Sequence, residues 1–190
     1  MANDFRSARF WAREMIENAM YPGARAIDAT MGNGHDTCTL ARLVGEKGHV
    51  YAFDVQEQAV EKTRERLEAE GLSARVSLFC TGHEDMAQHV PDGVRAVAFN
   101  LGWLPGGDKS VTTRWETTFR ALNAALELLL PMGVCTVCAY PGHEAGEVER
   151  QELAEYLAKL PPQRYNVLRQ TFINAGPGAP ECFVIQRQGV

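Results

Sequence analysis

The sequence has no apolar run that approaches the roughly 20 residues needed by a membrane-spanning helix. A secretory leader is not evident either, because charged side chains interrupt the amino-terminal segment where its apolar centre would lie. These charged residues are Asp4, Arg6, Arg9 and Arg13. We therefore expect a cytoplasmic protein with no membrane partner.

An excess of positive charge is also missing. The formal net charge is −5, which excludes the strongly basic coat that binds nucleic acid without sequence preference. A local basic patch is still compatible with this charge, because Arg6, Arg9 and Arg13 have the i, i+3, i+7 spacing of one helix face. The alternative interpretation is a solvated face with no partner.

The cysteines do not form a disulfide framework. There are five of them, an odd number, so they cannot all pair within one chain. Cys135 and Cys138 form a C-x-x-C inside the apolar run 134–139, which predicts a strand. Side chains three positions apart on a strand point to opposite faces. We therefore interpret this pair as buried thiols rather than as a metal site.

Apolar periodicity predicts one domain, residues 1–190, in which strands and helices alternate. An amphipathic helix over 4–20, within an amino-terminal segment 1–22, should pack on this domain. A later helix should begin with a capping box of Thr113 and Glu116 and end at Pro131-Met132-Gly133. The other predicted helices span 36–44, 56–70 and 143–160, and the predicted strands span 24–29, 49–54, 75–80, 94–100, 134–140, 165–172 and 182–187.

This alternation predicts a Rossmann-like α/β fold with helices on both faces of a mostly parallel, seven-stranded sheet. The last two strands have no helix between them, so they should form a terminal antiparallel pair. In such sheets a ligand binds at the carboxyl ends of the strands.

A glycine-rich turn follows the first predicted strand. Its sequence, Asp28-Ala-Thr-Met-Gly32-Asn33-Gly34-His35, lies between a strand and a helix, so its backbone N–H groups can approach a ligand. Asp54 ends the next strand, 20 positions after Gly34 (54 − 34). A carboxylate at this place can accept both ribose hydroxyls of an adenosine. The alternative is a solvated aspartate at a strand end.

The turn favours S-adenosylmethionine over a nicotinamide dinucleotide. The dinucleotide pattern is G-x-G-x-x-G, and Thr37 occupies its third glycine position. Asp28 would repel a pyrophosphate, whereas it suits the cationic amino group and sulfonium of the methyl donor. An oxidoreductase is therefore the weaker alternative.

Two further strand ends offer contacts to the adenosine. Gln56 follows Asp54 closely, and Gly82-His83 follows the third strand. No second ligand has suitable spacing from His83, so we interpret this histidine as an adenine or helix-entry contact and predict no metal site.

The segment Asn100-x-x-Trp103 ends the fourth strand and fits methyl transfer to nitrogen. An asparagine carbonyl can accept a hydrogen from a neutral amine and orient its lone pair, while an aromatic face can stack on a base and favour the developing cation. The two prolines usual in amino-group methyltransferases are missing here. Asp108 is the nearest candidate proton acceptor, and Lys109 or Arg114 could hold a phosphate. In the alternative, Trp103 belongs to the core.

Three segments together resemble a small bacterial family. They are residues 28–37, residues 100–109 and Gly142-His143, and the likeness runs from about Arg25 to Ile185. The family was long described as putative rRNA methylases. It is now understood as the tRNA 5-aminomethyl-(2-thio)uridine methyltransferases, which complete the methylaminomethyl group at wobble position 34.

The resemblance implies an N-methyltransferase with the class I fold, S-adenosyl-L-methionine as cofactor, and a homodimer that acts on the tRNA anticodon stem-loop. It implies that residues 100–109 face the nucleotide, with His143 on the same side. The predicted cofactor residues are Asp28, Gly32, Asn33, Gly34, His35, Asp54, Gln56, Gly82 and His83. Two positions depart from the family, since Trp103 replaces an expected Tyr and Gly82 an expected Ser.

Two other functions remain as alternatives. One is methylation of an rRNA base or of a small-molecule amine. The other is a non-catalytic tRNA-binding module that keeps a relict cofactor pocket, against which the intact Asn33, Asp54 and Asn100 speak.

Overall fold

The computed structural model describes residues 7–91 and 93–189. Its strands are β1 (Arg25–Asp28), β2 (His49–Asp54), β3 (Val76–Cys80), β4 (Val94–Asn100), β5 (Leu129–Ala139), β6 (Tyr165–Gln170) and β7 (Glu181–Arg187). Its α-helices are α1 (Ala8–Ala19), α2 (His35–Val44), α3 (Glu57–Ala69), α4 (Met86–His89), α5 (Trp115–Leu128) and α6 (Glu144–Leu157), and two 3-10 turns are η1 (Ser73–Arg75) and η2 (His83–Asp85). Arg6, one of the three arginines of the predicted basic face, lies outside the described residues.

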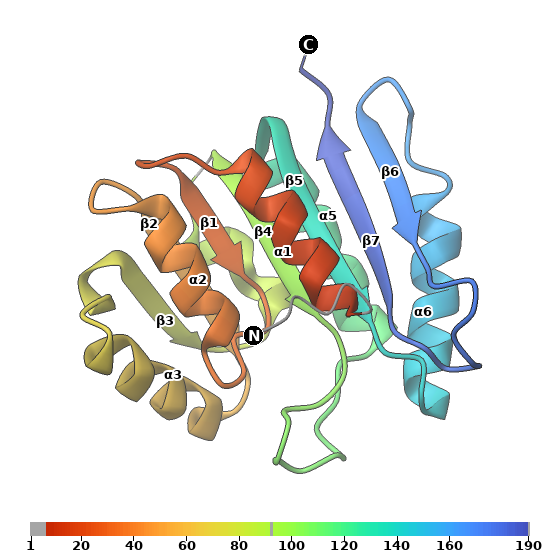
Figure 1. Ribbon diagram of the computed structural model, residues 1–190, viewed down its shortest axis with the longest axis horizontal. Coiled ribbons are helices and arrows are strands. Elements are labelled where there is room, and N and C mark those ends of the chain that lie inside the picture. Colours follow the sequence, from red (N-terminus) through yellow and green to blue (C-terminus); the bar gives the residue numbers. More distant parts are fainter. Residues whose placement is uncertain (1–6, 92, 190) are drawn as a thin grey trace.

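The strands form one sheet in the order β3-β2-β1-β4-β5-β7-β6 (Figure 1). Strands β1 to β5 are parallel, while β7 runs antiparallel to both β5 and β6. The predicted fold class, including the terminal antiparallel pair, is confirmed. The chain proceeds outward in opposite directions from β1 and β4, so the connections diverge at their carboxyl ends and leave room there for a ligand.

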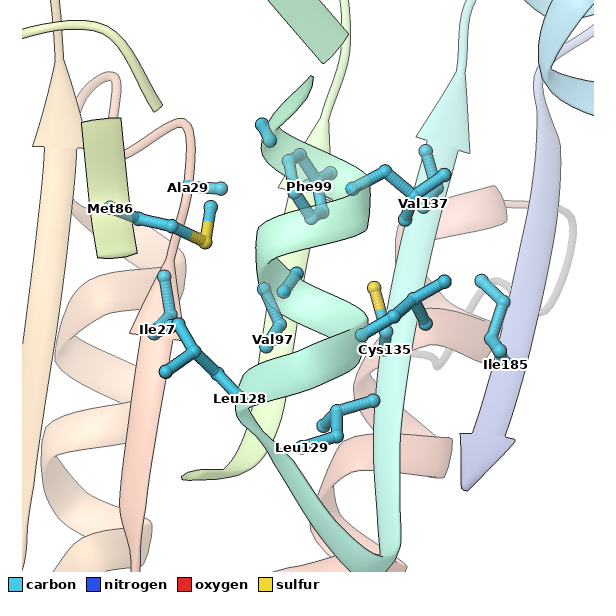
Figure 2. Close-up of a cluster of buried hydrophobic side chains, with 14 of the residues drawn as sticks. Ile27, Ala29, Met86, Val97, Phe99, Leu128, Leu129, Cys135, Val137 and Ile185 are labelled. Atoms are coloured by element: carbon cyan, nitrogen blue, oxygen red, sulfur yellow. The ribbon is translucent and has the colours of Figure 1, made fainter. Parts of the chain in front are cut away.

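Helices cover both faces of the sheet. One face carries α1, α2 and α3, which pack with Ala26, Val50 and Ala96 of the strands. The other carries α4, α5 and α6. Figure 2 shows Phe99 and Val137, from β4 and β5, in the buried cluster beside α5. Alternating side chains of each buried strand therefore enter different cores, as period-2 geometry requires.

Cys135 and Cys138 follow the same alternation. Cys135 belongs to the α5-side core, whereas Cys138 packs with α1 and lies opposite Cys182 in the β5–β7 ladder. All three thiols are buried and free. This confirms the prediction that the C-x-x-C residues point to opposite faces.

Two predicted boundaries are wrong. Helix α5 has Arg114 as its N-cap residue, with no side-chain cap, so Thr113 and Glu116 form no capping box. Strand β5 begins at Leu129, before the Pro131-Met132-Gly133 segment that should have preceded it. The ladder with β4 shifts register there, and Met132 adopts a φ of 63°. A bulge therefore accommodates these residues within the strand.

None of the described helices is long and apolar enough to span a bilayer.

Candidate active site

A cavity of about 670 Å³ opens at the carboxyl ends of the central strands. The glycine-rich turn, the ends of β2 and β4, and the loop 101–113 line it, and in Figure 1 this loop is the green excursion below the sheet. Predicted site residues on its wall are Gly32, Asn33, His35, Asp54, Gln56, Gly82, His83, Asn100, Trp103, Arg114 and His143. The sequence thus identified residues that the fold brings to one place.

Asp54 is held by the backbone on both carboxylate oxygens. Gly32 N–H donates to Oδ2 at 3.0 Å, and Gln56 N–H donates to Oδ1 at 3.0 Å. Partial burial raises the pKa of Asp54, while these backbone donors oppose that rise. The side chain has few orientations left, and its remaining acceptor capacity faces the cavity. This geometry suits a pair of ribose hydroxyls.

Gly34 supports the turn from behind. Its φ is 81°, and a Cβ atom there would lie 2.9 Å from Thr63 Oγ1. Only glycine combines this left-handed conformation with such close packing. Gly34 is not on the cavity wall, so its place in the site is structural.

Asn33 and His35 frame the cavity beside the turn. Asn33 Nδ2 lies 3.4 Å from the carbonyl oxygen of Pro105, in the loop 101–113. Partial burial lowers the pKa of His35, and the nearby Arg66 guanidinium adds to the effect. A neutral imidazole at this rim can contact a cofactor without repelling its cationic groups.

Asp28 differs from the expected cofactor contact. Its carboxylate is fully buried, accepts from Thr37 Oγ1 at 2.6 Å and from Thr30 N–H at 3.3 Å, and does not line the cavity. Burial raises its pKa to about 7. The carboxyl group therefore ties the turn to α2 and does not face a bound cation.

His83 joins η2 to the end of β1. It is 7% exposed, its Nδ1 lies 3.2 Å from Ala29 O, and its ring meets Phe99 edge to face. A carbonyl oxygen only accepts, so Nδ1 carries the proton. Burial lowers the pKa of His83, so the ring stays neutral.

Asn100 is connected to two residues that the sequence did not single out for the site. Its Nδ2 donates to Asp36 Oδ2 at 2.8 Å, and Arg9 donates to Asp36 Oδ1 at 2.7 Å. All three line the cavity. Asp36 was visible only as the residue after the glycine turn, and Arg9 only as part of a basic helix face.

The loop 101–113 is closed at its base. Trp103 and Thr112 form an antiparallel bridge. Two hydrogen bonds join Gly102 and Thr113. Gly102 N–H donates to Thr113 Oγ1 at 2.7 Å, and Thr113 N–H donates to Gly102 O at 3.0 Å. The loop is therefore a hairpin whose two arms leave the domain side by side.

A buried carboxylate anchors this hairpin. Glu149, 2% exposed on α6, accepts from Thr113 Oγ1 at 2.7 Å and from Thr118 Oγ1 at 2.6 Å. Burial raises the pKa of Glu149, while the two hydroxyl donors oppose the rise. The carboxylate thus joins the loop, α5 and α6. Sequence analysis missed it because its partners lie 36 and 31 positions away.

Three predicted substrate-side residues meet at an aromatic cluster. The Trp103 and His143 rings are 4.4 Å apart, and Lys109 Nζ lies 5.5 Å from the Trp103 ring centre. His143 Nδ1 accepts from Gly146 N–H at 3.1 Å and caps α6. The proton of the neutral ring therefore resides on Nε2. The rings are tilted by 48° to one another, so each offers a separate face to a nucleobase, and the nearby cation suits a phosphate.

Asp108 does not fit the role of proton acceptor. It is exposed, accepts from Ser110 N–H at 2.8 Å and is not on the cavity wall. Hydrogen bonds from Ser110 lower its pKa, so the carboxylate is a weak base. Its place is in the turn at the tip of the loop.

The geometry agrees with the relatives of this chain. Residues 50–186 match the family described as "Putative rRNA methylase". The chain is 36% identical over 187 residues to "tRNA (mnm(5)s(2)U34)-methyltransferase, chloroplastic" of Arabidopsis thaliana, an alignment that covers 93% of this chain and 68% of that protein.

Two crystal structures are similar to this chain along almost their whole length. One, a putative rRNA methylase from Clostridium thermocellum, has 39% identity and a TM-score of 0.94, with 95% of this chain and 97% of that chain covered. The other, a putative methyltransferase from Streptococcus mutans in complex with SAH, has 34% identity and a TM-score of 0.87, with 95% and 98% covered. The cavity at the carboxyl ends of β1, β2 and β4 is the place where this fold binds such a ligand. The chain therefore belongs to the family described as "Putative rRNA methylase", and it is a class I methyltransferase that uses S-adenosylmethionine.

Proposed function

We propose that this enzyme methylates the primary amine of 5-aminomethyluridine at wobble position 34 of tRNA, giving 5-methylaminomethyluridine. The observation that carries the proposal is the Asn100 side chain on the cavity wall, whose Nδ2 is committed to Asp36. Its carbonyl oxygen is left to accept a hydrogen from an incoming amine. The printed name of the Arabidopsis thaliana relative specifies a uridine at position 34 and supports this choice of acceptor.

The transfer itself is a displacement at the methyl carbon. The lone pair of the neutral amine forms the new N–C bond, the S–C bond breaks, and its electron pair stays on sulfur as S-adenosylhomocysteine. The nitrogen becomes a secondary ammonium, which can leave protonated and lose its proton to water. Asn100 orients the lone pair by accepting one amine hydrogen.

The cofactor would lie against the turn side of the cavity. Asp54 accepts the ribose hydroxyls, Gln56 and Gly82-His83 border the adenine, and Gly32-Asn33 face the methionine part. The nucleobase would occupy the opposite wall, where Trp103 offers a stacking surface. Lys109 and Arg114, both exposed beside it, provide charge for phosphates.

The test offers the enzyme tRNA that carries 5-aminomethyluridine, together with methyl-labelled donor, and then digests the product to nucleosides. We expect label in 5-methylaminomethyluridine, and none with tRNA whose position 34 is unmodified uridine. Asn100→Ala serves as the control with strongly reduced labelling. Label only in rRNA or in a free amine would refute the proposed acceptor and leave the enzyme class intact.

We also propose that two copies of the chain associate. Strand β6 is at the sheet edge, and Val167 and Leu168 on it are 39% and 49% exposed. An edge strand with exposed apolar side chains readily pairs with another chain. Sedimentation equilibrium should give a dimer for the wild type and a lower mass for Leu168→Lys, whereas a wild-type monomer would refute this.

A further inference from the structure

The Asp36 carboxylate lies between two donors on the cavity wall. Arg9 of α1 donates to Oδ1 and Asn100 of β4 donates to Oδ2, at 2.7 and 2.8 Å. Asp36 also belongs to the first turn of α2, where the positive end of the helix dipole stabilises a negative charge. The two hydrogen bonds fix the orientation of the carboxylate.

The hydrogen bond between Asn100 and Asp36 determines which end of the Asn100 amide faces the acceptor amine. The two ends of an asparagine amide have nearly the same shape, so its orientation depends on hydrogen bonding. An ionised carboxylate can only accept. The alternative orientation would place Asn100 Oδ1 against Asp36 Oδ2, oxygen against oxygen. Asp36 therefore holds Nδ2 and turns the carbonyl away from itself.

We propose that Asp36 is a positioning residue for methyl transfer, which fixes the Asn100 amide with its carbonyl oxygen toward the acceptor amine. Arg9 completes this arrangement by donating to the second carboxylate oxygen of Asp36. Helix α1, remote in sequence from both strand β4 and the glycine turn, thereby contributes to the reaction centre. This inference rests on the proposed function only in assigning an amine as the group that Asn100 orients.

Removal of the acceptor tests this arrangement directly. Asp36→Leu keeps a side chain of similar size and frees the Asn100 amide. We expect kcat to fall by about 10- to 100-fold, because misaligned reacting groups lose rate steeply. The affinity for S-adenosylhomocysteine, measured by calorimetry, should change less than about threefold. Glu57→Leu, which removes an exposed first-turn acid of α3, is the matched control with unchanged kcat.

The isosteric variant Asp36→Asn gives a sharper test. Its single amide oxygen should accept from the charged Arg9, which leaves its amide N–H pointing at Asn100. Asn100 must then reverse and present its own N–H to the amine. We expect Asp36→Asn to lose as much kcat as Asp36→Leu, although its shape is unchanged.

An exchange of the two residues should restore the arrangement. Asn100→Asp alone brings two carboxylates together, which disfavours ionisation of both. In the double variant Asp36→Asn with Asn100→Asp, the amide at 36 accepts from Arg9 and donates to the carboxylate at 100, whose other oxygen faces the amine. We expect this double variant to exceed Asn100→Asp by about tenfold or more in kcat, a rescue that a merely structural role of Asp36 would not produce.

A measurement without tRNA separates this inference from the proposed function. In ¹⁵N-labelled enzyme with S-adenosylhomocysteine, the Asn100 side-chain amide is identified by its loss in Asn100→Ala. We expect slow hydrogen exchange at this amide in the wild type and exchange at least tenfold faster in Asp36→Leu. If the wild type fails to methylate aminomethyluridine while this protection depends on Asp36, the proposed acceptor is wrong and the positioning role stands.

Three outcomes would overturn the positioning role itself. The first is a wild-type kcat in Asp36→Leu and Asp36→Asn. The second is a loss of S-adenosylhomocysteine affinity as large as the loss of kcat, which would make Asp36 a cofactor ligand. The third is an Asn100 amide that exchanges at the same rate in the wild type and in Asp36→Leu.

Discussion

The cofactor side and the substrate side of the cavity are built differently. On the cofactor side, Asp54 is oriented by backbone N–H groups of Gly32 and Gln56 at the ends of two parallel strands. On the substrate side, the loop 101–113 is anchored to the rest of the domain by side chains, above all Thr113 and Glu149. Backbone contacts follow from the fold and persist through substitution. The substrate side can therefore change with single side chains while the cofactor side stays the same.

The largest effect should come from Asn100, where the two sides meet. Asn100→Ala removes the group proposed to orient the amine, so kcat should fall by roughly 10²-fold or more, while the affinity for the methyl donor changes little. Single-turnover kinetics and calorimetry on one preparation measure both. A variant with normal turnover would place the acceptor elsewhere in the cavity.

Asp54→Ala should produce the opposite pattern. It removes a charge-assisted acceptor for two hydroxyls, so cofactor affinity should drop by about 2–3 kcal/mol. The rate at saturating cofactor should be nearly unchanged. Calorimetry with S-adenosylhomocysteine measures the loss, and equal affinity in variant and wild type would refute the assignment of Asp54.

Glu149→Leu should damage only the substrate side. It leaves the hydroxyls of Thr113 and Thr118 without their buried acceptor, at a cost of about 1–3 kcal/mol in stability. The hairpin loses its anchor, so the KM for the proposed tRNA substrate should rise by about tenfold, with cofactor affinity intact. Thr39→Val, which removes a partly exposed helix hydroxyl on α2, is the control that should leave the KM unchanged. An equal loss of cofactor affinity in Glu149→Leu would show that the two sides are coupled.

Asp28 should affect the reaction least, and its contribution should be visible as a pH dependence of stability. Its folded pKa, about 7, lies above the unfolded value of 3.8. Between these values only the folded state retains the proton, so stability falls as pH rises from about 4 to 7. Asp28→Asn removes this pH-dependent loss. The difference in melting temperature, variant minus wild type, should therefore rise as pH rises from about 4 to 7 and stay constant above pH 7. Parallel melting curves across the window would refute the shift.

The sequence predicted what local patterns determine. Alternating apolar periods identified the sheet and its antiparallel end, and polar residues after strand ends identified Asp54 and Asn100. It could not reveal bonds between distant positions, since Asn100 and Asp36 are 64 residues apart and Thr113 and Glu149 are 36 apart. The wrong prediction of a capping box has the same cause, because the Thr113 hydroxyl donates to Glu149 and accepts from Gly102 N–H, both of which lie outside helix α5.

The closed base of the loop 101–113 also has an entropic consequence. The two hydrogen bonds between Gly102 and Thr113, one of them to the Thr113 hydroxyl, and the Trp103–Thr112 bridge order both arms when the protein folds. Each residue that is ordered in advance saves about 1–2 kcal/mol of backbone entropy on binding. Only the loop tip, around Gly106, then loses freedom when substrate enters. Association should therefore be less opposed by entropy than expected for a loop of this length, and the affinity for the proposed tRNA substrate should weaken less on warming.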